Sequence, residues 1–289
     1  MTLRELLNIG TDFLKKQGNE DAVTESELLL CHLLKKDRIY LYVYGREPAD
    51  EDLCQIFFDL LQRRAGGKPL QYILGTVEFM GISLSVNESV LIPRQDTEIL
   101  VEEALKELSK LTQFLRHHQI LDLCTGSGAL AISLAKLDRK ARVIAADLSD
   151  EALAVARKNA ASAGLTDAIC FCQGDLFDAL DGQGPFDLIL SNPPYIATDV
   201  IDTLAVEIRD HEPRMALDGG SDGLDLIRRI LKEAPRHMKT GGLLLMEIGY
   251  DQGDTVRALA LSQEKSFVRA RILRDLNGND RVLKVRKTR

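Results

Sequence analysis

From residue 119 onward, short apolar runs alternate with segments whose apolar residues recur at helical spacing. The runs that predict strands are residues 119–123, 141–146, 168–173, 186–191 and 242–248, and the segments that predict helices are residues 128–136, 149–163, about 224–238 and 251–262. Strands that alternate with helices form a parallel sheet sandwiched between those helices. The alternation therefore constrains the fold to the α/β class.

Two later runs, residues 267–273 and 281–286, complete the predicted sheet. They flank Asn277-Gly278, a dipeptide that favours a tight hairpin turn. We therefore expect an antiparallel pair at one edge of a seven-stranded, mostly parallel sheet.

The N-terminal segment predicts helices only. The signals are two capping-box spacings, Thr2 with Glu5 and Thr24 with Glu27, and an apolar stripe from about Asp50 to Ala65. Residues 71–93 then place apolar residues among glycines, which predicts a β-hairpin. We expect a helical bundle over residues 1–70, a hairpin linker over 71–93 and the α/β domain over 94–289.

Composition argues against several classes of protein. The chain carries 37 Lys and Arg against 44 Asp and Glu, a net charge of −7, which disfavours a large surface for non-specific nucleic-acid binding. The first residues lack the basic start and apolar core of a signal peptide, and no apolar run approaches the ~18 residues of a membrane helix. We expect a cytoplasmic protein without membrane contact.

The cysteines and histidines predict no metal site. The five cysteines form no C-x-x-C pair and the five histidines show no ligand spacing, so free thiols in a reducing compartment are expected. Cys170 and Cys172 alternate along a predicted strand, where we expect them to share a buried face.

A glycine-containing loop joins the strand at 119–123 to its helix. Gly126 and Gly128 allow the backbone to approach a ligand and supply amides at a helix start. Taken alone, Gly126-x-Gly128-x-x-Ala131 fits a dinucleotide fingerprint, and Asp147 lies about 20 residues further on, where a carboxylate binds ribose hydroxyls. This spacing leaves a dinucleotide and other nucleoside cofactors open.

Asp122 distinguishes between these cofactors, because an acid beside the loop suits a cationic amino-acid end better than a pyrophosphate. Asp122, Gly126 and Gly128 resemble the first motif of S-adenosylmethionine-dependent methyltransferases, D/E-x-G-x-G-x-G, with Cys124 in place of the first glycine. The resemblance implies a Rossmann-like class I methyltransferase domain, S-adenosylmethionine as cofactor and S-adenosylhomocysteine as product. The expected cofactor contacts are Asp122, Cys124, Thr125, Gly126, Ser127, Gly128, Asp147, Leu148, Asp175, Leu176 and Asn192. For Asp175, an adenine contact and a helix cap remain equal alternatives.

The turn Asn192-Pro193-Pro194-Tyr195 ends the strand at 186–191, because prolines cannot donate to a sheet ladder. In a doubly wound sheet, this turn and the glycine loop both lie beyond the carboxyl ends of strands, where ligands bind. The turn resembles the motif of enzymes that methylate planar nitrogens, in adenine, guanine or an amide. We expect these four residues to bind the substrate and to make the catalytic contacts.

A planar nitrogen is weakly nucleophilic because its lone pair is delocalised. Two acceptors, the Asn192 side-chain oxygen and the Pro193 carbonyl, are expected to hold both N–H bonds and to aim the lone pair at the methyl group. Tyr195 is expected to pack on the flat face of the substrate. No general base is required before attack, since the nitrogen becomes acidic as it is alkylated.

Further segments resemble the release-factor glutamine methyltransferases, the PrmC/HemK family. They are residues 67–75, 78–81, 91–98, 212–224 and 277–281, and the resemblance extends over nearly the whole chain. The sequence departs from the family at Gln95-Asp96, where Pro-Glu is frequent, and at Leu176, where some members carry an aromatic residue. Arg94 either belongs to a solvated helix start or lines the cleft between the domains, and in the second case we expect it to contact the substrate.

By this resemblance, the chain methylates the side-chain amide nitrogen of the glutamine in the Gly-Gly-Gln motif of peptide-chain release factors, which act in translation termination. The helical domain would dock the factor, while the linker and residues 212–224 shape the pocket. We expect a monomer that binds no nucleic acid directly.

Three other functions remain open from the residues. An adenine- or guanine-N methyltransferase acting on DNA or RNA shares both motifs, although a basic docking domain is expected of it. A nicotinamide-dependent oxidoreductase is favoured by the glycine spacing and opposed by Asp122 and the Asn192 turn. A non-enzymatic adaptor is opposed by the presence of Gly128, Asp147 and Asn192.

Overall fold

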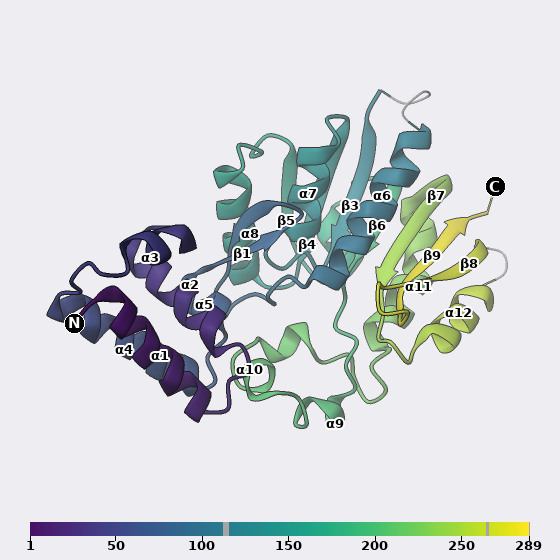
Figure 1. Cartoon of the computed structure of the whole chain (residues 1–289). Helices are drawn as coiled ribbons and strands as arrows, with labels where there is room; N and C mark the ends of the chain where they lie inside the picture. Colours follow the sequence, from purple (N-terminus) through teal and green to yellow (C-terminus); the bar gives the residue numbers. More distant parts are fainter. Residues whose placement is uncertain (112–115, 264–265, 289) are drawn as a thin grey trace. The chain divides into compact units, whose positions relative to one another are not determined.

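A computed structural model describes residues 1–111, 116–263 and 266–288 of the chain (Figure 1). Internal contacts divide it into a helical unit, Met1–Gly75 with Ala205–His211, and a sheet unit, Thr76–Leu204 with Glu212–Arg289. The short segment 205–211 thus groups with the helical unit, although we placed it inside the α/β domain. Within the described ranges, none of the helices has both the length and the apolarity of a membrane span.

The helical unit packs its helices around a leucine-rich core that includes Leu6, Leu29 and Phe57. Its helices are α1 (Leu3–Lys16), α2 (Ala22–Leu34), α3 (Arg38–Tyr44), α4 (Glu51–Ala65), α5 (Leu70–Leu74) and α10 (Val206–Arg209). The predicted capping box at Thr2 is confirmed: its side chain accepts from the amide of Glu5, whose carboxylate accepts from the Thr2 amide.

The second predicted capping box is wrong. Helix α2 begins at Ala22, so Thr24 and Glu27 both lie inside it. Glu27 is buried, and its carboxylate accepts a 2.7 Å hydrogen bond from the hydroxyl of Tyr42 in α3. Helix α3 was not predicted, because its aromatic and β-branched residues are poor helix formers; the side chain of Asp37 caps its start.

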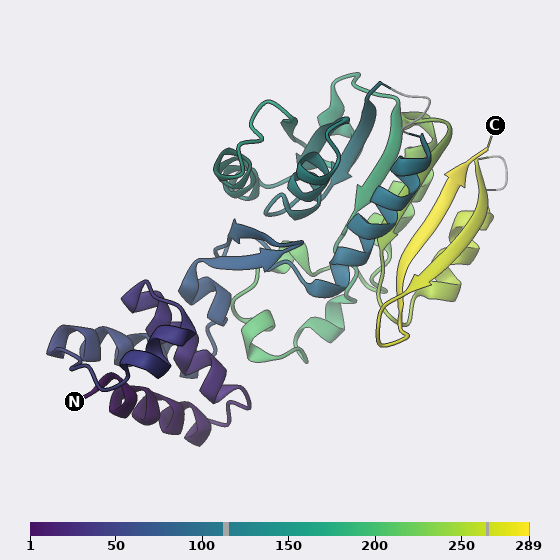
Figure 2. The same ribbon diagram turned by 45° about the horizontal axis from the view of Figure 1, so that its top comes forward.

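The sheet unit contains seven strands in the order β5-β4-β3-β6-β7-β9-β8. They are β3 (His118–Leu123), β4 (Ala141–Asp147), β5 (Ile169–Gln173), β6 (Phe186–Ser191), β7 (Met238–Glu247), β8 (Phe267–Arg274) and β9 (Asp280–Lys287). Strands β3 to β7 pair in parallel, whereas β9 is antiparallel to both β7 and β8. The predicted fold class is confirmed, including the antiparallel pair at one edge (Figure 2).

Helices cover both faces of this sheet. Helices α6 (Glu98–Leu111), α7 (Ala129–Leu137) and α8 (Asp150–Ser162) contribute to one apolar cluster, and α11 (Asp225–His237) and α12 (Gly253–Leu261) to the other. Neighbouring residues of β3 alternate between them, since Ile120 belongs to the first cluster and Leu121 to the second. Burial on both faces explains why the strands appear as uninterrupted apolar runs in the sequence.

Shorter elements surround the carboxyl ends of the strands. They are the antiparallel hairpin β1 (Thr76–Phe79) and β2 (Ile82–Ser85), the 3₁₀ turns η1 (Gln95–Thr97), η2 (Leu176–Leu180) and η3 (Arg214–Ala216), and helix α9 (Thr198–Ile201). The side chain of Asn159 in α8 connects β2 to the loop between β3 and α7. It accepts from the amide of Ser85 at 2.7 Å and donates to the carbonyl of Ser127 at 2.9 Å.

The prediction that Cys170 and Cys172 share a buried face is wrong in one respect. The two thiols do lie together, with their Sγ atoms 4.0 Å apart. However, β5 is an edge strand, and Cys170 is exposed while Cys172 is half-buried. The edge position of a strand cannot be read from its own residues.

Candidate active site

The loop between β3 and α7 turns through left-handed backbone conformations. Gly126 has a φ of 55° and Gly128 a φ of 83°. A Cβ atom at Gly128 would lie 3.0 Å from Ile132 Cδ1 and 3.1 Å from the Cβ of Ala156, so this glycine also permits the close packing of α7 and α8. Cys124 adopts a φ of 58°, a conformation that costs any residue with a Cβ roughly 1–2 kcal/mol.

Asp122 supports this loop from inside the protein. Its Oδ2 accepts hydrogen bonds from the Thr125 hydroxyl at 2.6 Å and from the amide of Ala131 at 3.1 Å. Its Oδ1 has no hydrogen-bond partner among the described residues. Complete burial raises the pKa of Asp122 to about 7, against the effect of the Thr125 hydroxyl. The side chain does not line the cavity described below, so the structure assigns Asp122 to holding the loop.

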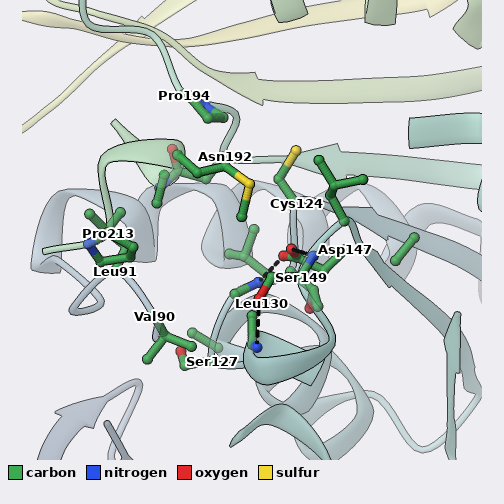
Figure 3. A pocket seen from close by; sticks show the side chains of 18 of the residues that line it. Val90, Leu91, Cys124, Ser127, Leu130, Asp147, Ser149, Asn192, Pro194 and Pro213 are labelled. Atoms are coloured by element: carbon green, nitrogen blue, oxygen red, sulfur yellow. Dashed lines mark hydrogen bonds between the residues drawn. The ribbon is translucent and has the colours of Figure 1, made fainter. Parts of the chain in front are cut away.

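Asp147, at the end of β4, binds the same loop from the other side. Its Oδ2 accepts from the amide of Gly126 at 2.8 Å, and its Oδ1 accepts from the amide of Ser149 at 3.0 Å (Figure 3). Burial raises the pKa of Asp147. Each carboxylate oxygen retains a further lone pair, and Asp147 lines a cavity. Its carboxylate can therefore accept hydrogen bonds from the two hydroxyls of a diol.

This cavity lies beyond the carboxyl ends of β3, β4, β5 and β6. The predicted cofactor residues that line it are Cys124, Thr125, Gly126, Ser127, Asp147, Leu148, Asp175, Leu176 and Asn192. Asp122 and Gly128 do not line it; they shape the loop that does. Opposite this loop, the segments before α6 and around η3 add apolar walls that include Leu91 and Pro213, across the cavity from Cys124 and Asp147 (Figure 3).

Of the two alternatives for Asp175, the helix cap is not realised, and the adenine contact stays a prediction. It precedes η2, but its side chain makes no capping hydrogen bond. Its Oδ2 instead accepts from Arg229 of α11 at 2.9 Å, while the residue still lines the cavity. Leu176, for which the family pattern left a contact uncertain, is buried and lines the cavity directly.

The turn after β6 presents only part of itself to the cavity. Asn192 and Pro194 line it, whereas Pro193 and Tyr195 do not. The Asn192 Nδ2 donates to the hydroxyl of Thr97 at 3.4 Å. This contact leaves the Asn192 Oδ1 as an available acceptor.

Tyr195 has a different position from the one expected. Its ring packs against the core beside α11 and α12, and its hydroxyl donates to Glu247 Oε1 at 3.0 Å. Burial and the neighbouring Glu247 raise the pKa of Tyr195. The tyrosine thus anchors the turn to the sheet, because its ring is directed into the protein interior.

Arg94 also binds a protein group. Its guanidinium forms an ion pair with the buried Glu212 and donates to the carbonyl of Ile92 at 3.0 Å. Arg94 does not line the cavity. It connects residues 91–98 to residues 212–224, the two segments that supply the apolar walls.

Residues at this site that were not identified from the sequence include Thr97, Glu247 and Gln252. Thr97 lines the cavity beside Asn192. Gln252 donates from Nε2 to the carbonyl of Tyr195 at 2.9 Å. Glu247 is an acid at the end of an apolar strand, and this signal in residues 242–248 could have identified it. The described ranges contain no cluster of three or more potential metal ligands.

Proteins of known sequence resemble this chain along almost its whole length. The "Release factor glutamine methyltransferase" of Geobacter sulfurreducens is 42% identical, over 98% of this chain and 95% of the relative. Proteins of the same name from Moorella thermoacetica and Rhodopirellula baltica are 41% and 36% identical, over 97% and 99% of this chain and 97% and 96% of the relatives. Two family models match, "PrmC N-terminal domain" at residues 5–75 and "Methyltransferase domain" at residues 115–278.

Solved structures share the fold. The hMettl16 catalytic domain in complex with MAT2A 3'UTR hairpin 6 superposes with a TM-score of 0.57 at 12% identity, covering 90% of this chain and 92% of that one. The delta-N METTL16 MTase domain superposes with a TM-score of 0.52 at 17% identity, covering 72% and 89%. At these identities the similarity concerns the fold alone.

Proposed function

Because this chain belongs to the family of release factor glutamine methyltransferases, we propose that it methylates the side-chain amide nitrogen of a release-factor glutamine. The acceptor is the glutamine of the Gly-Gly-Gln motif, and the reaction converts S-adenosylmethionine to S-adenosylhomocysteine. The observation that carries the proposal is the position of Asn192, which lines the same cavity as the glycine loop and Asp147.

The residues of the cavity fit the cofactor. Asp147 is held by two backbone amides with lone pairs remaining for the ribose hydroxyls, and Gly126 leaves open space where a Cβ would lie. Asp175 and Leu176 follow β5 and line the cavity, and we propose that they contact the adenine. When bound, S-adenosylmethionine supplies an electrophilic methyl group.

The turn after β6 provides the acceptor clamp. With its Nδ2 directed to Thr97, Asn192 presents Oδ1 to one N–H of the substrate amide, and the Pro193 carbonyl accepts the other. Holding both N–H bonds fixes the nitrogen and stabilises the positive charge that develops as it is alkylated. Pro194 keeps the turn rigid. Tyr195 supports the clamp from behind through Glu247.

The substrate is a protein, so a surface beyond the cavity is required to recognise it. The helical unit has no other proposed role, and we assign it the docking of the release factor. We propose that the enzyme acts as a monomer in the cytoplasm and binds no nucleic acid directly. The net charge of −7 supports the last point.

The three alternative functions are less well supported. An oxidoreductase or an adaptor is inconsistent with the family to which the chain belongs. An adenine or guanine methyltransferase would use the same clamp, but relatives at 36–42% identity over nearly the whole chain are named for release-factor glutamine.

Transfer of a labelled methyl group separates these functions. The enzyme is given labelled S-adenosylmethionine with a release factor, with the same factor carrying Gln→Ala in Gly-Gly-Gln, or with DNA and RNA. We expect label on the unmodified factor alone. Label on nucleic acid, or equal label on the Gln→Ala factor, would contradict the proposal.

A further inference from the structure

Gln252 lies at the start of α12, but its side chain does not cap that helix. It occupies the N-cap position, where a short polar side chain commonly accepts from the first free amides, and it makes no such hydrogen bond. The side chain binds backbone groups outside the helix instead. Its Oε1 accepts from the amide of Gly249 at 2.9 Å, and its Nε2 donates to the carbonyl of Tyr195 at 2.9 Å.

These backbone groups fix the orientation of the Gln252 amide. An N–H group only donates, so the atom that faces Gly249 is the oxygen. Carbonyl oxygens only accept, so the NH₂ group faces Tyr195 and also Gly223, whose carbonyl oxygen lies 3.4 Å from Nε2. One side-chain amide thus joins three backbone groups, and the reversed orientation would satisfy none of them.

The two carbonyls belong to different segments that both line the cavity. Tyr195 ends the acceptor clamp, and Gly223 belongs to residues 212–224. The lining residues are Asn192 and Pro194 from the clamp and Pro213, Met215 and Ala216 from residues 212–224. Gly223 has a φ of 73°, and a Cβ there would lie 2.3 Å from the Tyr195 carbonyl oxygen. The two segments therefore meet backbone to backbone beside the Gln252 amide.

Backbone hydrogen bonds continue this contact beyond Tyr195. Ile196 and Asp218 form an isolated parallel bridge, in which the Ile196 amide donates to the Leu217 carbonyl at 3.0 Å. The Gly219 amide donates to the Ile196 carbonyl at 2.8 Å. The chain that leaves the clamp is thus paired with residues 212–224. Gln252 joins this pair to Gly249, which follows the end of β7.

We propose that Gln252 is a positioning residue that holds the acceptor clamp and residues 212–224 in the arrangement methyl transfer requires. The proposal rests on the proposed function, in which the Asn192 turn holds the substrate amide. A small displacement of the acceptor nitrogen from the methyl group lowers the rate even when both substrates are bound. Gln252 does not line the cavity, so its effect reaches the substrate through the backbone of Tyr195.

Two substitutions of Gln252 separate this role from simple support of the helix start. Gln252→Met keeps the length of the side chain and removes all three hydrogen bonds. Gln252→Glu keeps an acceptor for the Gly249 amide but places a second oxygen against the carbonyls of Tyr195 and Gly223. If the NH₂ group is what matters, Gln252→Glu is at least as damaging as Gln252→Met.

The measurement is the single-turnover rate of methyl transfer with release factor and S-adenosylmethionine both saturating. We expect Gln252→Met to lower this rate about 10-fold and Gln252→Glu to lower it at least as much. The dissociation constant for S-adenosylhomocysteine should change less than about threefold in either variant. Gln263→Met, two residues beyond α12, is the matched control and should keep the wild-type rate.

Three results would overturn the proposal. They are a wild-type rate for Gln252→Glu, a rate for Gln252→Met no lower than that of Gln263→Met, and a loss confined to the affinity for S-adenosylhomocysteine. Each would show that the NH₂ group of Gln252 does not position the acceptor.

Hydrogen exchange without substrate distinguishes failure of this inference from failure of the proposed function. The amides of Ile196 and Gly219 bond between the two segments, and they should exchange faster in Gln252→Met than in the wild type, whereas those of β3 should not change. Unchanged exchange at Ile196 and Gly219 would reject the inference, whatever the wild type methylates. Absence of release-factor methylation by the wild type would reject the proposed function, whatever the exchange rates.

Discussion

At the scale of single residues, the cofactor loop contains a side chain where its backbone favours glycine. Cys124 has a φ of 58° and lines the cavity. The sequence indicated this position, because Cys124 replaces the first glycine of the methyltransferase motif. The structure adds the physical reason for the glycine that the motif prefers.

We predict that two substitutions of Cys124 change stability by different amounts. Cys124→Gly relieves the left-handed strain but adds unfolded-state entropy, so the free energy of unfolding should change by less than about 1 kcal/mol. Cys124→Val places a β-branched residue in this conformation and should lower the free energy of unfolding by about 1–3 kcal/mol. It should also weaken cofactor binding. Urea denaturation measures both, with Cys54→Val in α4 as the control at an ordinary helical position. Equal losses of unfolding free energy for Cys124→Val and Cys54→Val would contradict the claim that the backbone at Cys124 is strained.

Asp122 predicts a dependence of stability on pH. Its folded pKa of about 7 lies above the ordinary value of 3.8, so the folded state binds more protons than the unfolded state between these values. The contribution of Asp122 to stability should therefore decrease as pH rises from 3.8 to about 7. Asp122→Asn removes this titration, and the variant should gain stability relative to the wild type across that range.

Equilibrium unfolding of the wild type and of Asp122→Asn from about pH 4 to pH 8 measures how their stability difference changes with pH. A constant difference between wild type and Asp122→Asn would show that Asp122 is ionised throughout. Such a result would also remove the argument that Asp122 is a fully desolvated support for the loop.

The sequence identified residues by the chemistry of local motifs, and it failed where orientation depends on distant partners. Asn192 and Asp147 were predicted from their turns, and both line the cavity. The direction of the Tyr195 ring is set by Glu247, 52 residues away, and Thr97 meets Asn192 across 95 residues. No spacing rule within one segment relates such residues.

At the scale of elements, periodicity predicted the strands and helices of the sheet unit. Strand β6 was expected at 186–191 and is Phe186–Ser191, and β3 begins one residue before the expected 119–123. The exceptions are elements whose neighbours decide their state. Helix α3 forms despite its residue preferences, since Leu41 joins the core of the helical unit.

The helical unit contains a buried ion pair that predicts a large stability effect. Arg64 of α4 donates from Nε to Glu25 of α2 at 2.6 Å, and its Nη2 pairs with Glu207 of α10 at 2.6 Å. The side chains of Arg64 and Glu25 are 10% and 12% exposed, whereas that of Glu207 is 43% exposed. Arg64→Met should therefore cost about 3–5 kcal/mol, because it leaves Glu25 buried without its charge partner.

Glu207→Gln is the matched comparison, since it removes the solvent-exposed partner of the same arginine. It should cost less than about 1 kcal/mol. Adding Glu25→Gln to Arg64→Met should recover part of the loss. Urea denaturation of the four proteins measures these differences, and similar costs for the Arg64 and Glu207 variants would contradict the assigned burial.

At the scale of the whole molecule, the helical unit and the sheet unit are each similar to other proteins in a different way. The helical unit matches the family model "PrmC N-terminal domain", and the sheet unit has a fold shared with methyltransferases of low sequence identity. Fold alone does not specify the acceptor. The assignment to release-factor glutamine depends on relatives that match from end to end.

The central claim is that Asn192 holds a release-factor glutamine for methylation, and tandem mass spectrometry of the methylated factor tests it most directly. A release factor is incubated with S-adenosylmethionine and either the wild type or Asn192→Ala, and the position of the added methyl group is determined. We predict one methyl group on the side-chain nitrogen of the Gly-Gly-Gln glutamine. With Asn192→Ala, the rate should fall by roughly 10²–10³ while S-adenosylhomocysteine still binds. A methyl group on another residue, or an undiminished rate with Asn192→Ala, would contradict the account.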